Sequence, residues 1–427
     1  MIDVPTERLE FPAGFVWGTA ACAHQVEGGN WNNDWWEWEH RPGTPCIEVS
    51  GDACDHYHRY EEDFALLAFF GHNAHRLGLE WARIEPERDE ISNAALDHYA
   101  RVLDSLHAHG LIPFVTLHHF SSPRWLAAEG GWAAPGVADR FHRYAEVVAR
   151  RLGERIPFVC TINEPHIVAI AGYQGTWFPP GAGDVKLYPV VTRNFIRAHA
   201  AALEAFKEHR PEARVGLVLA TSHYEAVDEA SRAVRDRIHH RTTGVYHQAL
   251  RDGVIRGFGE EEEVPGLAGR SDFVGVNYYS RTRIDVSAPL NTAPVPPDAE
   301  ITQMGYEVVP HCFVPVLHEA ARATGLPVYV TENGIGTDDD RQRVRFIARH
   351  LAAVRQAIDE GADVRGYLYW SSMDNFEWTF GYARTFGLIA VDRGTFARSP
   401  KPSAHYFGEI AQANAVDPET TRRYLEP

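Results

Sequence analysis

The stretch FVCTINEP, residues 158–165, is an apolar and β-branched run that ends in a carboxylate and a proline. The apolar residues predict a buried strand, and Pro165 predicts its end. The stretch VYVTENG, residues 328–334, repeats this arrangement around Glu332. A carboxylate at the carboxyl end of a buried strand is costly to place and adds nothing to core packing. Glu164 and Glu332 therefore indicate a pair of carboxylates that act together.

Other apolar stretches extend this strand pattern over the whole chain. Candidate strands cover residues 15–19, 73–78, 112–118, 158–163, 215–220, 273–278, 328–332 and 364–370. Amphipathic stretches predict helices between them, at 60–70, 95–109, 137–151, 192–209, 314–324 and 341–360. This alternation predicts βα units around a parallel sheet. We therefore predict an α/β fold with a single (β/α)₈ TIM barrel and elaborated βα loops, one catalytic domain over residues 1–427.

An open, doubly wound sheet is the alternative α/β architecture. Its usual mark is a GxGxxG turn after the first strand, and the sequence has none there. Polar and aromatic residues instead occur at the ends of the candidate strands, as Arg76, His119, Asn163 and Asn277 do. In a closed barrel all these strand ends meet at one face, where βα loops build the active site.

Composition excludes several classes of partner. The chain has 427 residues, 44% of them hydrophobic, and a formal net charge of −17. This balance supports a large core and argues against nucleic acid or an anionic membrane as partner. The N-terminus has no signal-peptide pattern and no apolar run is long enough to span a bilayer, so we expect a cytoplasmic protein.

The five cysteines predict neither a disulfide framework nor a zinc site, because their number is odd and none forms a CxxC pair. We therefore expect free thiols and no metal or cofactor. Positive charge comes almost wholly from arginine, which is typical of a bacterial genome rich in G and C.

Two opposed carboxyl groups suit the cleavage of a glycosidic bond. Retaining glycosidases hold them about 5–5.5 Å apart, and inverting enzymes about 6.5–9.5 Å apart to admit a water molecule. We expect Asn163 to bind a sugar 2-hydroxyl beside Glu164. We expect Arg76 and Tyr279 to keep a second carboxylate ionised and oriented.

The motifs occur in the order typical of one enzyme family. They are FVWGTA at 15–20, QVEG at 25–28, CDHYHRY at 54–60, TLHHF at 116–120, TINEP at 161–165, GVNYY at 275–279, TENG at 331–334 and WSSMDNFEW at 370–378. On these motifs the chain resembles glycoside hydrolase family 1, the β-glucosidase family, along nearly its whole length.

The resemblance implies roles for individual residues. Glu164 is expected to be the general acid/base and Glu332 the nucleophile, supported by Arg76, Asn277 and Tyr279. The expected sugar-binding residues are Gln25, His119, Asn163, Glu377 and Trp378, with Trp370 and Phe386 as walls. Tyr306 stands where the family commonly has tryptophan, and both an aglycone contact and ordinary packing stay open for it.

We therefore predict a metal-independent, retaining β-glycosidase of the β-glucosidase type, which removes terminal non-reducing sugars from small β-glycosides or oligosaccharides. A transglycosidase using the same covalent intermediate is one alternative, and product analysis with an alcohol acceptor separates the two. Preference for galactose, fucose or mannose is another. A non-catalytic sugar-binding barrel and a metal-dependent hydrolase are remote alternatives. The natural aglycone and the oligomeric state stay open.

Overall fold

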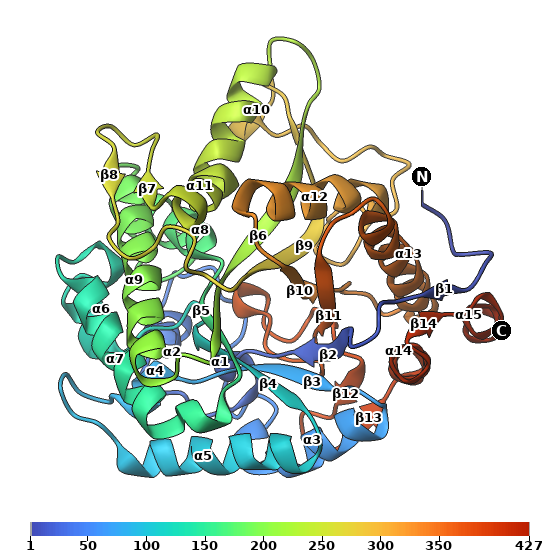
Figure 1. The fold of residues 1–427 in the computed structure, drawn as a ribbon, viewed down its shortest axis with the longest axis horizontal. Coiled ribbons are helices and arrows are strands. Elements are labelled where there is room, and N and C mark those ends of the chain that lie inside the picture. Colours follow the sequence, from blue (N-terminus) through green and yellow to red (C-terminus); the bar gives the residue numbers. More distant parts are fainter. Residues whose placement is uncertain (1, 427) are drawn as a thin grey trace.

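The computed structural model describes residues 2–426, so Met1 and Pro427, the ends of the predicted domain, lie outside the described residues. Within this range eight parallel strands close into a barrel in the order β10-β11-β2-β3-β4-β5-β6-β9. The predicted TIM barrel is confirmed (Figure 1). The barrel strands are β2 (Val16–Ala20), β3 (Ala74–Gly78), β4 (Ile112–His118), β5 (Phe158–Asn163), β6 (Arg214–Ala226), β9 (Phe273–Ile284), β10 (Val328–Asn333) and β11 (Val364–Trp370).

Helices form a ring around the strands in Figure 1. Parallel neighbours need such crossovers, because a tight hairpin can join only antiparallel strands. The longer helices are α3 (His56–Phe69), α5 (Asn93–Ala108), α7 (Val137–Leu152), α9 (Leu187–His209), α12 (Phe313–Thr324), α13 (Asp340–Asp359) and α14 (Pro402–Ala413). The shorter helices are α1 (Ala23–Val26), α2 (Asp34–His40), α4 (Trp81–Ile84), α6 (Arg124–Ala128), α8 (Pro165–Val168), α10 (Arg232–His239), α11 (Val245–Asp252) and α15 (Pro418–Leu425).

Most predicted elements agree with the structure to within a few residues, and β4, β5 and β11 agree at both ends. The largest difference is at β6 and β9, which each continue six residues beyond the predicted strand. They stay paired in parallel as far as Ala226 and Ile284 and form a ribbon that extends past the barrel. Polar and charged residues dominate 221–226 and 279–284, so these segments lack the apolar pattern of a buried strand.

An aromatic layer fills the amino-terminal end of the barrel. Phe114 of β4 stacks on Phe158 of β5, with ring centroids 4.1 Å apart. Tyr329 of β10 lies 5.5 Å from Phe114 and 5.4 Å from Phe273 of β9. These rings come from strands on different sides of the barrel, so they tie its wall together below the carboxyl ends of the strands.

The first and last described segments lie side by side at the right of Figure 1. There β1 (Leu9–Glu10) pairs with β14 (Ala415–Val416) in an antiparallel arrangement. The other short strands are β7 (Val254–Ile255), β8 (Glu262–Glu263), β12 (Ile389–Val391) and β13 (Arg398–Pro400). Within residues 2–426, no helix is both long and apolar enough to cross a bilayer.

Candidate active site

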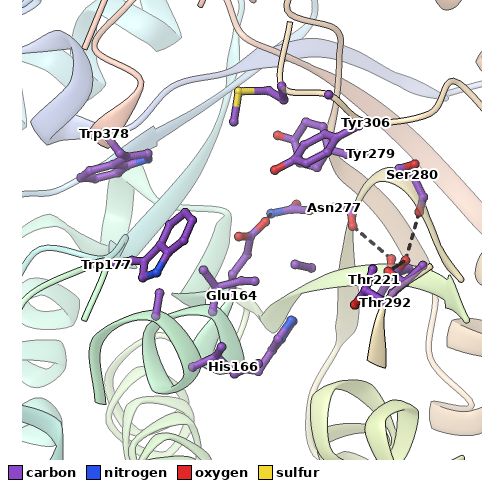
Figure 2. A pocket seen from close by; sticks show the side chains of 18 of the residues that line it. Glu164, His166, Trp177, Thr221, Asn277, Tyr279, Ser280, Thr292, Tyr306 and Trp378 are labelled. Atoms are coloured by element: carbon purple, nitrogen blue, oxygen red, sulfur yellow. Dashed lines mark hydrogen bonds between the residues drawn. The ribbon is translucent and has the colours of Figure 1, made fainter. Parts of the chain in front are cut away.

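A cavity of about 940 Å³ opens at the carboxyl ends of the barrel strands. It brings together side chains from the carboxyl ends of β4, β5, β6, β9, β10 and β11 and from the segments that follow them, and Figure 2 shows the Glu164 region. The predicted site residues that line it are His119, Glu164, Asn277, Tyr279, Tyr306, Glu332, Trp370, Glu377, Trp378 and Phe386. The three others, Gln25, Arg76 and Asn163, are fully buried and contact residues of this cavity or its floor.

Glu164 follows the last residue of β5 and is buried. Its φ of 49° is in the left-handed region, and Pro165 begins α8 directly after it. Such a conformation is unfavourable for a residue with a side chain, by about 1–3 kcal/mol, and typically persists where function requires it. The backbone N–H of Glu164 donates to the carbonyl of Val218 on β6 at 2.9 Å, which holds the turn in place.

The Glu164 carboxyl group is buried, and no arginine, lysine or histidine within residues 2–426 forms an ion pair with it. Burial, followed by the negative charge of Glu332, raises the pKa of Glu164 to about 8. The amide of Asn277 donates to Glu164 Oε1 at 2.7 Å and opposes part of this rise. At neutral pH Glu164 therefore carries a proton, as a general acid must.

Glu332, the fifth residue of β10, has different surroundings. Arg76 Nη1 donates to Glu332 Oε1 at 2.6 Å, and the Tyr279 hydroxyl donates to Oε2 at 2.7 Å. Burial raises the pKa of Glu332, while the Arg76 charge and these hydrogen bonds counter that rise. Both carboxylate oxygens thus have a donor, and the ionised form is favoured here over the ionised form of Glu164.

Asn277 is held in one orientation between the two glutamates. The Thr331 hydroxyl donates to Asn277 Oδ1 at 2.7 Å, so the amide nitrogen faces Glu164. We expected Asn277 to support the nucleophile. Its amide does lower the pKa of Glu332, but the amide nitrogen donates to Glu164 Oε1 and to Asn163 Oδ1, so Asn277 acts on both members of the pair. The role of Thr331 was not predicted from the sequence, because a threonine inside an apolar strand does not stand out from its neighbours.

Arg76 links Glu332 to the predicted sugar-binding residues. Its Nη2 donates to Asn163 Oδ1 at 2.6 Å, and its Nε donates to the Thr116 hydroxyl at 2.9 Å. Asn163 in turn donates through Nδ2 to His119 Nε2 at 3.1 Å. Burial and the Arg76 charge hold the pKa of His119 well below its usual range, so the imidazole is neutral and accepts this bond.

The other end of the cavity presents polar atoms that lack partners. Gln25 donates to the Phe376 carbonyl at 2.8 Å, but its Oε1 and Glu377 Oε2 are buried without a hydrogen-bond partner among residues 2–426. Burial and the Glu332 charge raise the pKa of Glu377 to about 8. Buried polar groups without partners are costly, so these two atoms favour a ligand with adjacent hydroxyl groups.

Aromatic rings stand beside these polar groups. The His119 ring is nearly parallel to Trp370 at 5.8 Å and to Trp378 at 6.1 Å between centroids. Phe386 lies edge-on to Tyr279 at 6.2 Å. A cavity with a flat aromatic wall and a few fixed polar groups is suited to a sugar ring, which has apolar faces and a polar edge.

The remaining part of the cavity is lined by both apolar and polar side chains. Trp177 and Tyr306 lie on opposite sides of the Glu164 carboxyl group in Figure 2, and Met304, Ile167 and Ile170 also line this part. Trp177 is 64% exposed and Tyr306 is 40% exposed, so both rings are available for contact. Sequence analysis missed Trp177, because it lies in an irregular loop without periodicity.

Comparison with known proteins gives consistent matches over almost the whole chain. The model of "Glycosyl hydrolase family 1" matches residues 7–416. "Beta-glucosidase A" of Thermotoga maritima is 33% identical, covering 96% of this chain and 99% of that protein. The structure of a β-glycosidase from Pyrococcus horikoshii is 36% identical with a TM-score of 0.91, covering 98% and 99% of the two chains. A β-glucosidase from T. maritima in complex with glucoimidazole is 32% identical with a TM-score of 0.89, covering 95% and 100%.

Proposed function

This chain belongs to glycosyl hydrolase family 1, and we propose that it works as a retaining β-glucosidase-type enzyme with Glu164 as general acid/base and Glu332 as nucleophile. One observation supports this assignment most strongly. Glu164 and Glu332 are buried and line one cavity, and within residues 2–426 Arg76 and the Tyr279 hydroxyl bind Glu332, whereas no ion pair is formed by Glu164. Their unequal surroundings divide the roles of acid and nucleophile between them.

In the first step Glu332 attacks the anomeric carbon and Glu164 gives its proton to the bridging oxygen. The carbon–oxygen bond to the aglycone breaks, and the glycosyl group becomes an ester of Glu332. Esterification removes the negative charge of Glu332. Because that charge contributes to the raised pKa of Glu164, the pKa of Glu164 falls and the residue becomes a better base.

In the second step the Glu164 carboxylate takes a proton from water, and the resulting hydroxide equivalent attacks the anomeric carbon. The ester bond breaks, Glu332 returns to its ionised form, and Glu164 is again protonated. Two inversions give net retention at the anomeric carbon. The cycle consumes one water molecule and needs no metal or cofactor.

We assign the glycone to the polar end of the cavity. Gln25, His119 and Glu377 are expected to bind its hydroxyl groups, Asn163 its 2-hydroxyl, and Trp378 an apolar face. Trp370 and Phe386 are expected to wall the same space. The β-glucosidase of similar structure that binds glucoimidazole supports a sugar-binding cavity of this kind.

We assign the leaving group to the part between Trp177 and Tyr306. This part has the exposed rings and the aliphatic side chains that an aryl or alkyl aglycone would contact. The proposed substrate is therefore a small β-glycoside. We also propose that the protein acts as one catalytic domain in the cytoplasm, which its free cysteines support.

Replacement of the acid tests this assignment. We expect Glu164→Ala to reduce the glycosylation rate on alkyl β-glucosides by about 10²–10⁴-fold, since a poor leaving group needs the proton. Activated aryl glucosides should lose much less in that step. Azide should restore turnover and give the β-glucosyl azide, because it can attack the ester without a general base.

Glu307→Gln is the matched control, because it changes another carboxylate of the cavity wall. Any loss of activity in Glu307→Gln should be similar for alkyl and aryl glucosides, and azide should not restore it. Equal losses for alkyl and aryl substrates in Glu164→Ala would contradict the acid role. Glu332→Ala should abolish hydrolysis of both substrates with the fold intact by circular dichroism.

A further inference from the structure

A second cluster of reactive side chains lies on the ribbon that extends from the barrel. His223 and Glu225 alternate along β6 and therefore lie on the same face of it. Cys312 reaches them from the short 3₁₀ turn η6 (Pro310–Cys312), which precedes α12. One ligand atom from each residue lies within 4.8 Å of the others. We infer that His223, Glu225 and Cys312 form a binding site for a zinc-type divalent cation.

The distances between the ligand atoms support this assignment. Zinc bonds of about 2.3 Å to sulfur, 2.05 Å to nitrogen and 2.1 Å to oxygen in a tetrahedron imply an N–O edge of about 3.4 Å and an S–O edge of about 3.6 Å. His223 Nε2 lies 3.5 Å from Glu225 Oε1, and Cys312 Sγ lies 3.7 Å from the same oxygen. Two edges of the coordination polyhedron are thus already formed, and Glu225 Oε1 is common to both.

The second oxygen of Glu225 is already oriented. Arg281 Nη1 contacts Glu225 Oε2 at 3.0 Å, which leaves Oε1 to face His223 and Cys312. Arg281 also pairs with Glu307, so one cation serves two carboxylates. A divalent ion together with the Cys312 thiolate would bring this group of charges to neutrality. Arg281 thereby fills the position of the hydrogen-bond partner that commonly orients a ligating carboxylate.

The ligands are in suitable states for binding. Burial lowers the pKa of His223, so its imidazole is neutral and has a free electron pair at pH 7. Burial and the Glu225 charge raise the pKa of the Cys312 thiol to about 12, so binding must displace the thiol proton to solvent as the metal–sulfur bond forms. The side chains of His223 and Glu225 are each one-third exposed, which gives the ion a path from solvent.

The three proposed ligands do not line the catalytic cavity, although Arg281 and Glu307 do. Ser222 and Tyr224, which alternate with His223 and Glu225 along β6, line the cavity on the other face of the ribbon. The ion would therefore sit behind the cavity wall and take no part in glycoside cleavage. This inference stands independently of the roles proposed for Glu164 and Glu332.

Cobalt(II) is a direct probe, because a cobalt–thiolate bond gives a charge-transfer absorption that oxygen and nitrogen ligands do not give. We expect the reduced full-length protein to develop this absorption up to one equivalent of cobalt, and zinc to remove it by competition. Cys312→Ser should abolish the absorption. His223→Ala should weaken cobalt binding by more than about 10–100-fold, the loss that typically follows removal of a side chain that only orients a ligand.

Cys46→Ser is the matched control, since Cys46 is a half-buried thiol outside the cluster. It should bind cobalt as the unchanged protein does. Absence of the charge-transfer absorption in the unchanged protein would overturn the inference. Retention of full affinity in His223→Ala would also overturn it, and this variant decides the matter if Cys312→Ser fails to fold.

Discussion

Glu164 and Glu332 are the same amino acid, yet their neighbours favour different protonation states and therefore different chemical roles. Arg76 and Tyr279 bind Glu332, whereas the Glu164 carboxyl group accepts a hydrogen bond from the amide of Asn277. The negative charge of Glu332 is the largest contribution, after burial, to the raised pKa of Glu164. Glu332→Gln should therefore lower the pKa of Glu164 from about 8, and an isotope-edited infrared titration of the carboxyl group would measure it.

Glu377→Gln is the control for this titration. Glu377 is also a buried carboxyl group of the cavity, but its charge has a smaller effect on Glu164 than that of Glu332. The pKa of Glu164 should fall less in Glu377→Gln than in Glu332→Gln. An unchanged Glu164 in Glu332→Gln, or the reverse order of the two shifts, would show that the two catalytic groups do not interact as described.

The pH dependence of kcat/KM follows from the same residue. Glu164 must be protonated to act as acid, so activity should fall as pH rises through a pKa of about 8 in the free enzyme. Asn277→Ala removes a donor that favours the ionised carboxylate. In this variant the pH at which kcat/KM falls on the alkaline side should therefore be higher, even if the rate itself is reduced. An alkaline fall in kcat/KM at the same pH as in the unchanged protein, or at a lower pH, would contradict this role of Asn277.

The identities of these residues could be predicted from the sequence, but their contacts could not. Glu164, Glu332 and Arg76 stand at strand ends, where polar side chains are conspicuous after apolar runs. Which glutamate Asn277 contacts depends on how β9 and β10 align, with Asn277 opposite Glu332. It also depends on Thr331, which fixes the amide of Asn277. Such details arise from register and rotamers, which a linear pattern does not contain.

At the level of the elements, apolar runs predicted the barrel strands because a parallel strand covered on both faces is continuously hydrophobic. The ribbon of β6 and β9 was missed because its faces meet the cavity and solvent, so its residues are mainly polar or charged and lack an apolar run. The polar helix α10 was missed for a related reason, since none of its residues is buried. Both of these segments lie outside the apolar core of the barrel.

The aromatic layer across β4, β5, β9 and β10 should dominate the stability of the barrel. Phe114 is fully buried in this layer, so Phe114→Ala should lower the free energy of unfolding by about 3–5 kcal/mol, measured by denaturant titration. Phe69→Ala is the control, because Phe69 is a phenylalanine that is 70% exposed. A loss in Phe114→Ala no greater than in Phe69→Ala would refute the importance of this layer.

For the whole molecule, the catalytic site should reduce stability at alkaline pH. The pKa of Glu164 is raised in the folded protein, so between pH 4.5 and about 8 the folded state binds a proton that the unfolded state has lost. Stability contributed by this proton is present at low pH and disappears as pH rises through this range, by about 1.4 kcal/mol per unit of pKa difference at most.

Glu164→Gln removes this titration while keeping the shape of the side chain. It should match the unchanged protein at pH 5 and exceed it in thermal midpoint at pH 8. Glu204→Gln, on the exposed face of α9, should show no such dependence on pH. Equal thermal midpoints for Glu164→Gln and Glu204→Gln at both pH values would show that burial does not raise the pKa of Glu164.

Trapping of the covalent intermediate tests the central claim most directly. A 2-deoxy-2-fluoro-β-glucoside with an activated leaving group slows both steps, but the second more, so the ester accumulates. Mass spectrometry of the digested protein should find one fluoroglucosyl group per chain, on the peptide that contains Glu332. A label on Glu164 or elsewhere, or turnover of substrate with inversion and no label, would contradict the assignment of Glu332 as nucleophile.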